Sequence, residues 1–556
     1  MKHVLIIWVF IFLVSASQAQ YSRHIIHLSN KAGSGYTLKD PTAYLSAKAL
    51  ERRAKSLTEI DSTDLPVTKT YIDSIKAAGS VTILSYSKWL NQVLIQTTDA
   101  AALNKISNFP FVKKTSPVAN KNNGNLIYTD KFRTYDQAQS QQPQIETKLQ
   151  SDVYDYGSNA SQVHIHHGEY LHNLGFTGKG ITIAILDGGF LNYTVLKAFD
   201  SVRNHNQILG TWDFVANETS VDEDHPHGMF CFSIMAANET GKYIGTAPKA
   251  SYYLFRTEDV ASEFPVEEHN WVVAAEKADS AGADMISSSL GYSLFDDPVF
   301  NYSYADLNGD ITMISRGADL AAKKGMIVCN SAGNSGNEAW KYIIAPADGD
   351  SVLAVGAVRI DSVPGSFSSY GPSADGRIKP DVASVGVNTW IINVDGTVAR
   401  GSGTSFANPN LAGLIACLWQ AFPEFSNMAI LDAVKKSSHK YANPDDRVGY
   451  GIPDMKKAYD LLLKQRADRV LKTDWVKAYP NPVVTTANVI VKAQETGDLL
   501  TQLSDMSGKL IQSSRTPVQQ GQVYFLKIDK INSVPSGVYH LRVFNGKSNT
   551  TIRLVK

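Results

Sequence analysis

The 556-residue sequence is poor in cysteine and has no excess of either charge. Its three cysteines, Cys231, Cys329 and Cys417, each lie in an apolar run. We therefore expect small buried hydrophobic side chains rather than a disulfide pair with one thiol left over, or a reactive thiol. Lys plus Arg and Asp plus Glu both number 53, so nothing favours electrostatic capture of nucleic acid and we expect no nucleic-acid partner.

Long hydrophobic runs are also scarce. The chain begins with Lys2 and His3, the apolar residues 4–14, and then Ser17-Gln18-Ala19, which predicts a signal peptide over residues 1–19 cut after Ala19. The apolar run is too short to span a bilayer comfortably, and no longer one follows. We therefore expect export, with no transmembrane segment in the mature chain.

A serine that suits a nucleophile stands at position 405. It follows Gly401-Ser402-Gly403-Thr404 and begins a long apolar stretch that contains Pro409. Glycines let a substrate backbone approach closely, and a helix beginning at Ser405 would direct its free amides and its positive dipole end at developing negative charge. Pro409 falls near the first turn, where a missing N–H costs little. These residues alone fit an ordinary N-cap serine equally well.

Two further segments supply a carboxylate and an imidazole. Residues 181–186 predict a buried parallel strand that ends at Asp187, although a structural aspartate is common at such a position. His227 precedes the apolar run 229–237 and would begin a helix, where a lone histidine is more often a cap or a surface residue. With Ser405 they form the acid, base and nucleophile that acyl transfer needs.

These motifs, in the order Asp, His, Ser, resemble those of the subtilisin-like serine proteases, the subtilases. Asp187 matches the aspartate after the family's first core strand, His227-Gly228 its helix start, and Gly403-Thr404-Ser405 its nucleophile segment. Residues 331–336 match the segment that holds an oxyanion-hole asparagine, here Asn334. The segment that pairs with substrate in the family corresponds to Ser289, Leu290 and Gly291.

The resemblance implies a doubly wound α/β catalytic domain with a mostly parallel sheet over residues 155–463. It implies that Ser405 attacks the scissile carbonyl, that His227 moves the proton and that Asp187 orients the imidazole. Asn334 would join the Ser405 N–H in binding the oxyanion. We expect polypeptide substrates, because a strand paired with residues 289–291 is held by its main chain. No cofactor is required.

Three positions depart from the family pattern. Gly188 replaces a small hydroxyl residue after the aspartate, Met229 replaces a threonine, and Phe406 replaces a methionine after the nucleophile. Gly188 removes one hydrogen bond that the Asp187 carboxylate would otherwise accept. None of the three changes deletes a reacting group. They leave open a competing class, a catalytically silent surface protein that keeps the subtilase fold for peptide binding.

The segment upstream of the catalytic motifs has a different character. Within residues 20–118, Glu51-Arg52-Arg53-Ala54-Lys55 lies in a predicted helix, residues 92–97 and 111–115 predict strands, and residues 99–106 predict a helix. This α+β pattern resembles the family's propeptide, with an unrelated accessory domain as the alternative. Residues 119–154, rich in Gln, Asn and Lys, predict a linker, and we expect self-processing there or shortly after it.

The carboxyl-terminal residues 475–556 show short alternating segments separated by turns, which predict a small β-sandwich. Tyr479-Pro480-Asn481-Pro482, Asp505-Met506-Ser507-Gly508-Lys509 and Gly537-Val538-Tyr539 resemble the sorting domain of type IX secretion in Bacteroidetes. The resemblance implies the type IX machinery as a partner and passage across the outer membrane to the surface or the medium. A carbohydrate-binding or adhesive sandwich is the alternative.

Two histidine-containing clusters raise the question of a metal. Residues 164–167 alternate like a solvated face, and residues 222–227 already have a function through His227. Metal-dependent hydrolysis through the second cluster would be a third functional class. Residues 306–310 resemble part of a calcium loop without its closing glutamate. A structural calcium ion is compatible with the family resemblance, but no residue is assigned as a metal ligand.

Overall fold

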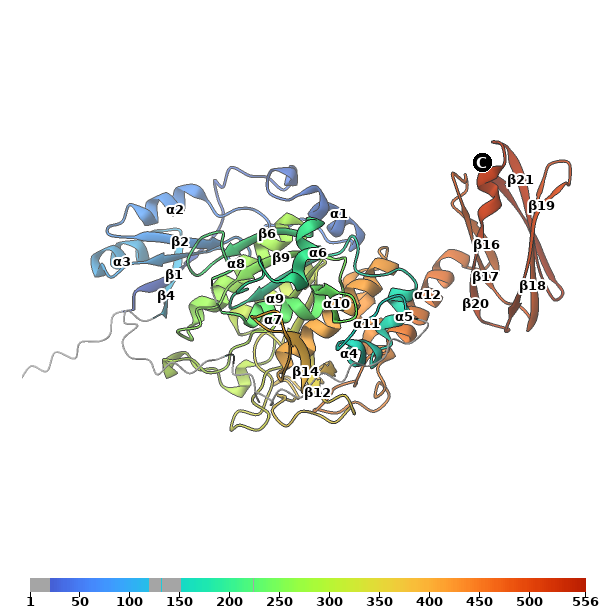
Figure 1. Ribbon diagram of the computed structural model, residues 1–556. Helices are drawn as coiled ribbons and strands as arrows, with labels where there is room; N and C mark the ends of the chain where they lie inside the picture. Colours follow the sequence, from blue (N-terminus) through green and yellow to red (C-terminus); the bar gives the residue numbers. More distant parts are fainter. Residues whose placement is uncertain (1–20, 120–131, 133–151, 224) are drawn as a thin grey trace, which may run out of the picture. The chain divides into compact units, whose positions relative to one another are not determined.

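The computed structural model describes residues 21–119, 132, 152–223 and 225–556 (Figure 1). The predicted signal peptide and most of the predicted linker lie outside these residues. The chain divides into two compact units, Met1–Met455 and Lys456–Lys556. Within the described residues, no helix has both the length and the apolar character needed to cross a membrane.

The centre of the first unit is a seven-stranded sheet in which every pairing is parallel. Its strand order is β13-β12-β11-β10-β5-β9-β6. The strands are β5 (Thr182–Asp187), β6 (Ile208–Asp213), β9 (Ser251–Arg256), β10 (Met285–Ser288), β11 (Ile327–Ser331), β12 (Val352–Val358) and β13 (Val382–Val385). After β5 the chain forms β6 and β9 on one side of that strand. It then crosses to β10 on the other side and continues outward through β11, β12 and β13, so the strand order reverses between β5 and β10. This confirms the predicted doubly wound α/β fold, in which ligands bind at the carboxyl ends beside such a reversal.

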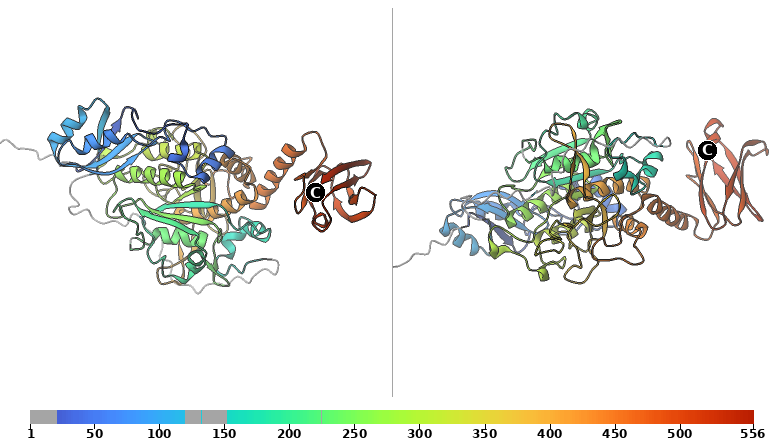
Figure 2. Two further views of the ribbon diagram at one scale, coloured as in Figure 1. Left: turned by 90° about the horizontal axis from the view of Figure 1, so that it is seen from above. Right: turned by 60° about the horizontal axis from the view of Figure 1, so that its bottom comes forward.

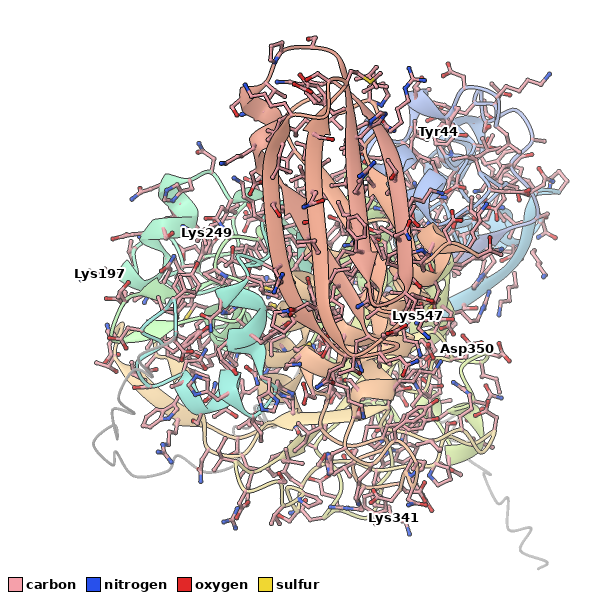
Figure 3. All side chains as sticks on the ribbon, turned by 90° about the vertical axis from the view of Figure 1, so that its right-hand side faces the viewer. Tyr44, Lys197, Lys249, Lys341, Asp350 and Lys547 are labelled. Carbon is pink, nitrogen blue, oxygen red and sulfur yellow. The ribbon has the colours of Figure 1, made fainter. Side chains whose placement is uncertain are left out.

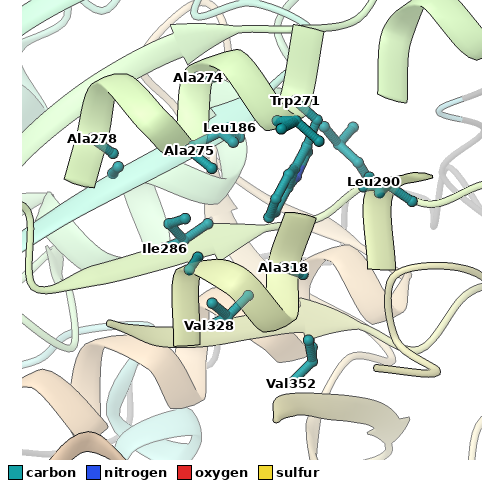
Figure 4. Packing of buried hydrophobic residues seen from close by; sticks show 14 of the residues in the cluster. Leu186, Trp271, Ala274, Ala275, Ala278, Ile286, Leu290, Ala318, Val328 and Val352 are labelled. Carbon is teal, nitrogen blue, oxygen red and sulfur yellow. The ribbon is translucent and has the colours of Figure 1, made fainter. Parts of the chain in front are cut away.

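Helices cover both faces of this sheet (Figure 1). On one face α8 (Pro265–Ala281) packs beside α9 (Met313–Lys323), and on the other α10 (Thr404–Ala421) packs beside α7 (His227–Ala236). Figure 4 shows Trp271 of α8 in one buried cluster with Leu186 and Ile286 of the sheet, and the small side chains Ala274, Ala275 and Ala278 follow it along the helix. Successive residues of a strand face opposite sides of the sheet, so the strand residues next to those that face α8 point toward α10 on the other side.

Shorter elements complete the first unit around the sheet. They are α4 (Ala160–His164), α5 (Gly168–Asn173), α6 (Asp200–Asn204), β7 (Asn238–Glu239), β8 (Tyr243–Ile244), β14 (Thr389–Ile392), β15 (Val398–Gly401) and α11 (Asn427–Ser437). The exposed side chains of Lys197 and Asp350 lie at the surface of this unit (Figure 3).

The amino-terminal part of the first unit is a four-stranded antiparallel sheet in the order β2-β3-β1-β4. Its elements are β1 (Arg23–Leu28), α1 (Ala47–Lys55), α2 (Lys69–Lys76), β2 (Thr82–Ser87), β3 (Gln92–Gln96), α3 (Ala100–Ser107) and β4 (Val112–Ala119). Ile26 packs with side chains of α2 and α3, whereas Ile25 packs with Phe264 and Val266 at the start of α8. Both views of Figure 2 show this sheet beside α8. The helices and strands predicted for this segment are confirmed.

The second unit is a β-sandwich of two antiparallel sheets, β16-β17-β20 and β19-β18-β21-β22. Its elements are α12 (Met455–Leu471), β16 (Val476–Tyr479), β17 (Ala487–Lys492), β18 (Gly497–Asp505), β19 (Leu510–Val518), β20 (Val523–Ile528), β21 (Val538–Asn545) and β22 (Ser548–Val555). Val489 from one sheet and Leu541 from the other share one buried core, while Lys547 lies exposed in the β21–β22 turn (Figure 3). The predicted sandwich is confirmed.

Candidate active site

Asp187 and His227 meet at the end of β5. Nδ1 of His227 lies 2.7 Å from Oδ1 of Asp187, and both side chains are buried. Gly228 permits this contact, because a Cβ there would lie 2.5 Å from the Gly189 carbonyl oxygen and 2.8 Å from Asp187 Cβ. A carboxylate at Nδ1 holds the ring in one orientation and leaves Nε2 for proton exchange.

The two carboxylate oxygens of Asp187 differ in their hydrogen-bond partners. Oδ1 also accepts a hydrogen bond from the Gly188 N–H at 2.7 Å, whereas Oδ2 is buried and accepts none from the described residues. The sulfur of Cys231 lies within 4.8 Å of a carboxylate oxygen of Asp187 and of a ring nitrogen of His227. All three cysteines are free and buried, as predicted, and burial raises the pKa of each thiol. Gly188 provides no hydroxyl for Oδ2, in line with the expectation from the sequence.

Ser405 is the second residue of α10, a helix that is buried on almost every face. Its Oγ donates a hydrogen bond to the Ser289 carbonyl oxygen at 3.4 Å. The Ser405 carbonyl oxygen accepts from Ser289 Oγ at 2.9 Å and from Cys231 Sγ at 3.3 Å. No hydrogen bond joins Ser405 to His227 in the described part of the chain. Catalytic hydrogen bonds of this kind often form only when substrate binds.

Asn334 follows β11 and turns its amide toward the same helix end. Its Oδ1 accepts hydrogen bonds from the N–H and the hydroxyl of Thr404, both at 2.9 Å, which fixes the orientation of the amide. The donor Nδ2 and the Ser405 N–H both border Gly403, since a Cβ built there would lie 3.8 Å from Nδ2 and 3.7 Å from the Ser405 nitrogen. Two N–H donors at a helix start suit a developing oxyanion.

A cleft of about 460 Å³ joins these groups. Every predicted site residue except Asp187 lines it: His227, Ser289, Leu290, Gly291, Asn334 and Ser405. Asp187 lies behind His227 and is fully buried. Leu290 and Gly291 follow β10 and make no backbone–backbone hydrogen bond with other described residues. Their backbone therefore runs along the cleft outside the sheet ladder.

Sequence reasoning missed several residues that line this cleft. Glu258, Glu263 and Glu338 bring carboxylates to it, and Ile344 enters it from the segment before β12. Glu258 had a detectable signal, because it follows β9, the parallel neighbour of β5, and parallel strands deliver their carboxyl ends to one edge.

Phe132 also lies in the cleft. Its ring stacks on His227 with 4.3 Å between the ring centroids and on His225 with 5.0 Å. A Cβ on Gly188 would lie 2.7 Å from this ring, so the glycine makes room for the aromatic side chain. Nothing in the Gln- and Asn-rich segment around position 132 pointed to this contact.

The clusters considered for a metal have other partners. His164 pairs with Asp152, and His166 is buried between the Pro453 carbonyl and the Ser384 hydroxyl, so the interpretation of residues 164–167 as a solvated face is wrong for His166. The Asp306 carboxylate accepts hydrogen bonds from the N–H and the hydroxyl of Ser303. The calcium site stays a prediction.

Three segments of the chain match known protein families. Residues 178–451 match the subtilase family. This part of the chain is a subtilase domain. Residues 23–134 match the peptidase S8 propeptide domain of Bacteroidota, and residues 477–556 match the secretion system C-terminal sorting domain. The predicted resemblances to a propeptide and to a sorting domain are confirmed, and the sorting domain indicates export to the surface or the medium.

Known relatives of the subtilase domain are bacterial proteases. Serine protease AprX of Bacillus subtilis is 28% identical over 335 residues, 55% of this chain and 70% of AprX. Subtilisin NAT of Bacillus subtilis subsp. natto is 28% identical over 277 residues, 49% of this chain and 64% of that protein. The solved structure of MycP1 from Mycobacterium smegmatis gives a TM-score of 0.43 at 21% identity, covering 54% of this chain and 84% of that one. The family and the two Bacillus relatives confirm the predicted class, a serine-type endopeptidase.

Proposed function

We propose that this exported subtilase hydrolyses peptide bonds of polypeptides with Ser405 as nucleophile, His227 as general base and acid, and Asp187 as the group that orients His227. The observation that carries the proposal is the 2.7 Å contact between His227 Nδ1 and Asp187 Oδ1 beside a cleft that Ser405 and Asn334 also line. A base, an orienting carboxylate and a hydroxyl on three separate elements match what acyl transfer requires.

In the proposed reaction, Ser405 Oγ attacks the scissile carbonyl carbon while His227 Nε2 takes the hydroxyl proton. The carbonyl oxygen becomes an oxyanion between Asn334 Nδ2 and the Ser405 N–H, at the positive end of α10. The imidazolium then gives its proton to the leaving amine. Water, activated by the same histidine, releases the acyl group from Ser405.

The substrate backbone would run along residues 289–291 in extended form. Ser289, Leu290 and Gly291 line the cleft, and the main chain of a peptide placed there would gain hydrogen bonds whatever its side chains. This supports proteins and peptides as substrates. We further propose that no metal or cofactor takes part in the reaction, so a chelator that leaves the fold intact should leave turnover unchanged.

Covalent labelling tests the assignment. The processed wild type should react with a fluorophosphonate, and Ser405→Ala should not react while keeping the circular dichroism spectrum of the unprocessed wild-type chain. Labelling that persists in Ser405→Ala would contradict the assigned nucleophile. Absence of labelling in the processed wild type would favour the silent binding protein, and inactivation by chelators without labelling would favour metal-dependent hydrolysis.

We propose that the sorting domain passes the protease through the type IX secretion machinery. Deleting residues 475–556 should then leave the protein in the periplasm. The remaining chain keeps the predicted signal peptide for passage across the inner membrane but lacks the domain for passage across the outer membrane. Normal release of the truncated protease would contradict this function of the domain.

A further inference from the structure

We propose that Ile344 closes the pocket for the side chain that precedes the scissile bond, so that this protease cleaves after small residues such as alanine, glycine and serine. The proposal rests on the proposed function, because only a scissile bond at Ser405 defines this pocket. It goes further by naming the residue that sets the class of substrate.

Two chain segments form the walls of the pocket. Strands β10 and β11 are parallel neighbours, with Ser288 paired to Asn330, so their continuations 289–291 and 332–334 leave the sheet side by side. Residues of both continuations line the cleft. In a bound substrate the scissile carbonyl oxygen would lie at Asn334 Nδ2, and the backbone would run along residues 289–291. The side chain of the residue before the scissile bond then points between these two walls.

Ile344 occupies the space between the walls. A Cβ built on Gly291 would lie 2.5 Å from both Cδ1 and Cγ1 of Ile344. A Cβ built on Gly333 would lie 3.0 Å from the same two atoms. One isoleucine side chain therefore contacts both glycines, which leaves no deep slot between them. Glycine at 333 is itself required by its backbone, with φ at +108°.

The backbone holds Ile344 in this place from both sides. Its N–H donates to the Ala332 carbonyl oxygen at 3.3 Å, in one wall. The next residue, Ala345, exchanges two hydrogen bonds with Tyr292, at 3.0 and 2.8 Å, next to the other wall. Ala345 and Tyr292 are buried, whereas Ile344 is partly exposed to the cleft. Because a β-branched side chain has few rotamers, Ile344 does not swing aside easily.

The expected discrimination follows from the fit of apolar groups. One methylene too many in a closed apolar pocket changes kcat/KM by about 10–200-fold. Leucine and phenylalanine exceed alanine by several carbon atoms, so we expect at least a ~100-fold preference for alanine over either in the wild type. Ile344→Ala removes the obstruction and should raise cleavage after leucine and phenylalanine by about 100-fold.

The test uses the processed protease, produced from the full chain, and peptides that differ only in the residue before the cleaved bond: glycine, alanine, serine, leucine or phenylalanine. Active sites are counted by fluorophosphonate labelling, and kcat/KM is measured for wild type, Ile344→Val, Ile344→Ala and Ile360→Ala. Ile360 is a matched control, because it is an exposed isoleucine outside the cleft. Ile344→Val keeps β-branching and should give a smaller shift in the same direction. Cleavage sites of the wild type in a denatured proteome supply a readout that needs no variant.

Preference for small residues in the wild type, relaxed in Ile344→Ala and unchanged in Ile360→Ala, would support the proposal. Equal cleavage after alanine and phenylalanine by wild type that labels normally would overturn the pocket assignment and leave the proposed function standing. The pocket assignment would also fall if Ile344→Ala labelled normally but shifted kcat/KM equally for all five peptides. Loss of both labelling and hydrolysis in the wild type would overturn the proposed function, and the proposal with it.

Discussion

Arg53 of the propeptide and Asp279 of the subtilase domain form a buried ion pair, with 2.7 Å between Nη2 and Oδ2. Their side chains are 2% and 0% exposed. Asp64 and Lys324 extend the pair into a network, with 2.9 Å between Lys324 Nζ and Asp64 Oδ2. Asp64 also pairs with Arg53 at 2.9 Å, so opposite charges from α1, the loop after α1, α8 and the turn after α9 are removed from water together.

Breaking this network should loosen the propeptide. We expect Arg53→Met to destabilise its docking by about 3 kcal/mol, the lower end of the effect of breaking a buried pair, because Asp279 keeps Arg52 and Asp64 keeps Lys324 as a partner. The measurement is hydrogen exchange of the α1 amides in a Ser405→Ala background, in which the expected self-processing should not occur. Arg359→Met is the matched control. Its partner Asp361 is exposed, so a loss below about 1 kcal/mol is expected, and equal effects of the two variants would contradict the prediction.

Glu276 should make the same interface sensitive to pH. Its carboxyl accepts hydrogen bonds from the Lys88 and Trp89 N–H groups at 2.8 and 3.0 Å and from the Ser87 hydroxyl. Burial raises the pKa of Glu276 from 4.5 to about 7, although the nearby Lys88 charge opposes the shift. The stabilisation is therefore complete below pH 4.5 and is lost as the pH rises through about 7, by up to about 3 kcal/mol.

The measurement is the pH dependence of thermal unfolding in the Ser405→Ala chain, with and without Glu276→Gln. The difference between the two curves should change between pH 4.5 and 7 and be flat above, since glutamine does not ionise. Glu51→Gln serves as the control, because Glu51 is exposed and pairs only with Lys55 in the described structure. Parallel curves for parent and Glu276→Gln would contradict the prediction.

Asn334 should act on turnover rather than on binding. Asn334→Ala is expected to lower kcat by about 10²–10³ with little change in KM, a magnitude measured on a subtilisin, a member of the same family. Asn334→Asp keeps the Oδ1 acceptor for Thr404 but lacks the Nδ2 donor, and should also lose turnover. The exposed Asn337, in the same loop, provides the control Asn337→Ala. Full kcat in Asn334→Ala would exclude it from the oxyanion site.

Phe132 should protect His227 before processing. Removing its stacked ring in Phe132→Ala is expected to speed fluorophosphonate labelling of the uncleaved chain about three- to tenfold, the equivalent of one aromatic contact. Gly188→Ala should act in the same direction, because its methyl would overlap the ring. Labelling is read from the uncleaved band on a gel, with Tyr36→Ala, an exposed aromatic of the propeptide, as control. Slower labelling in Phe132→Ala would contradict a protective contact.

Much of the fold was predictable because it follows local patterns. The apolar run before Asp187 became β5, and the all-apolar stretch after Ser405 became the buried helix α10. Motif order was equally informative, since Asp187 ends β5, Asn334 follows β11, and His227 and Ser405 lie in the first turns of α7 and α10. The burial of His166 was missed, because its partners, Pro453 and Ser384, are distant in the chain.

The sequence alone determined which chemical groups the protein carries, in what order, and on which kind of element, because strand and helix periodicity and short motifs are local properties. Only the tertiary structure decided the position of Ile344 between Gly291 and Gly333, the stacking of Phe132 on His227, and the buried pairing of Arg53 with Asp279. Each of these depends on two surfaces meeting that lie far apart in the chain, and packing, rather than propensity, sets the atoms that touch.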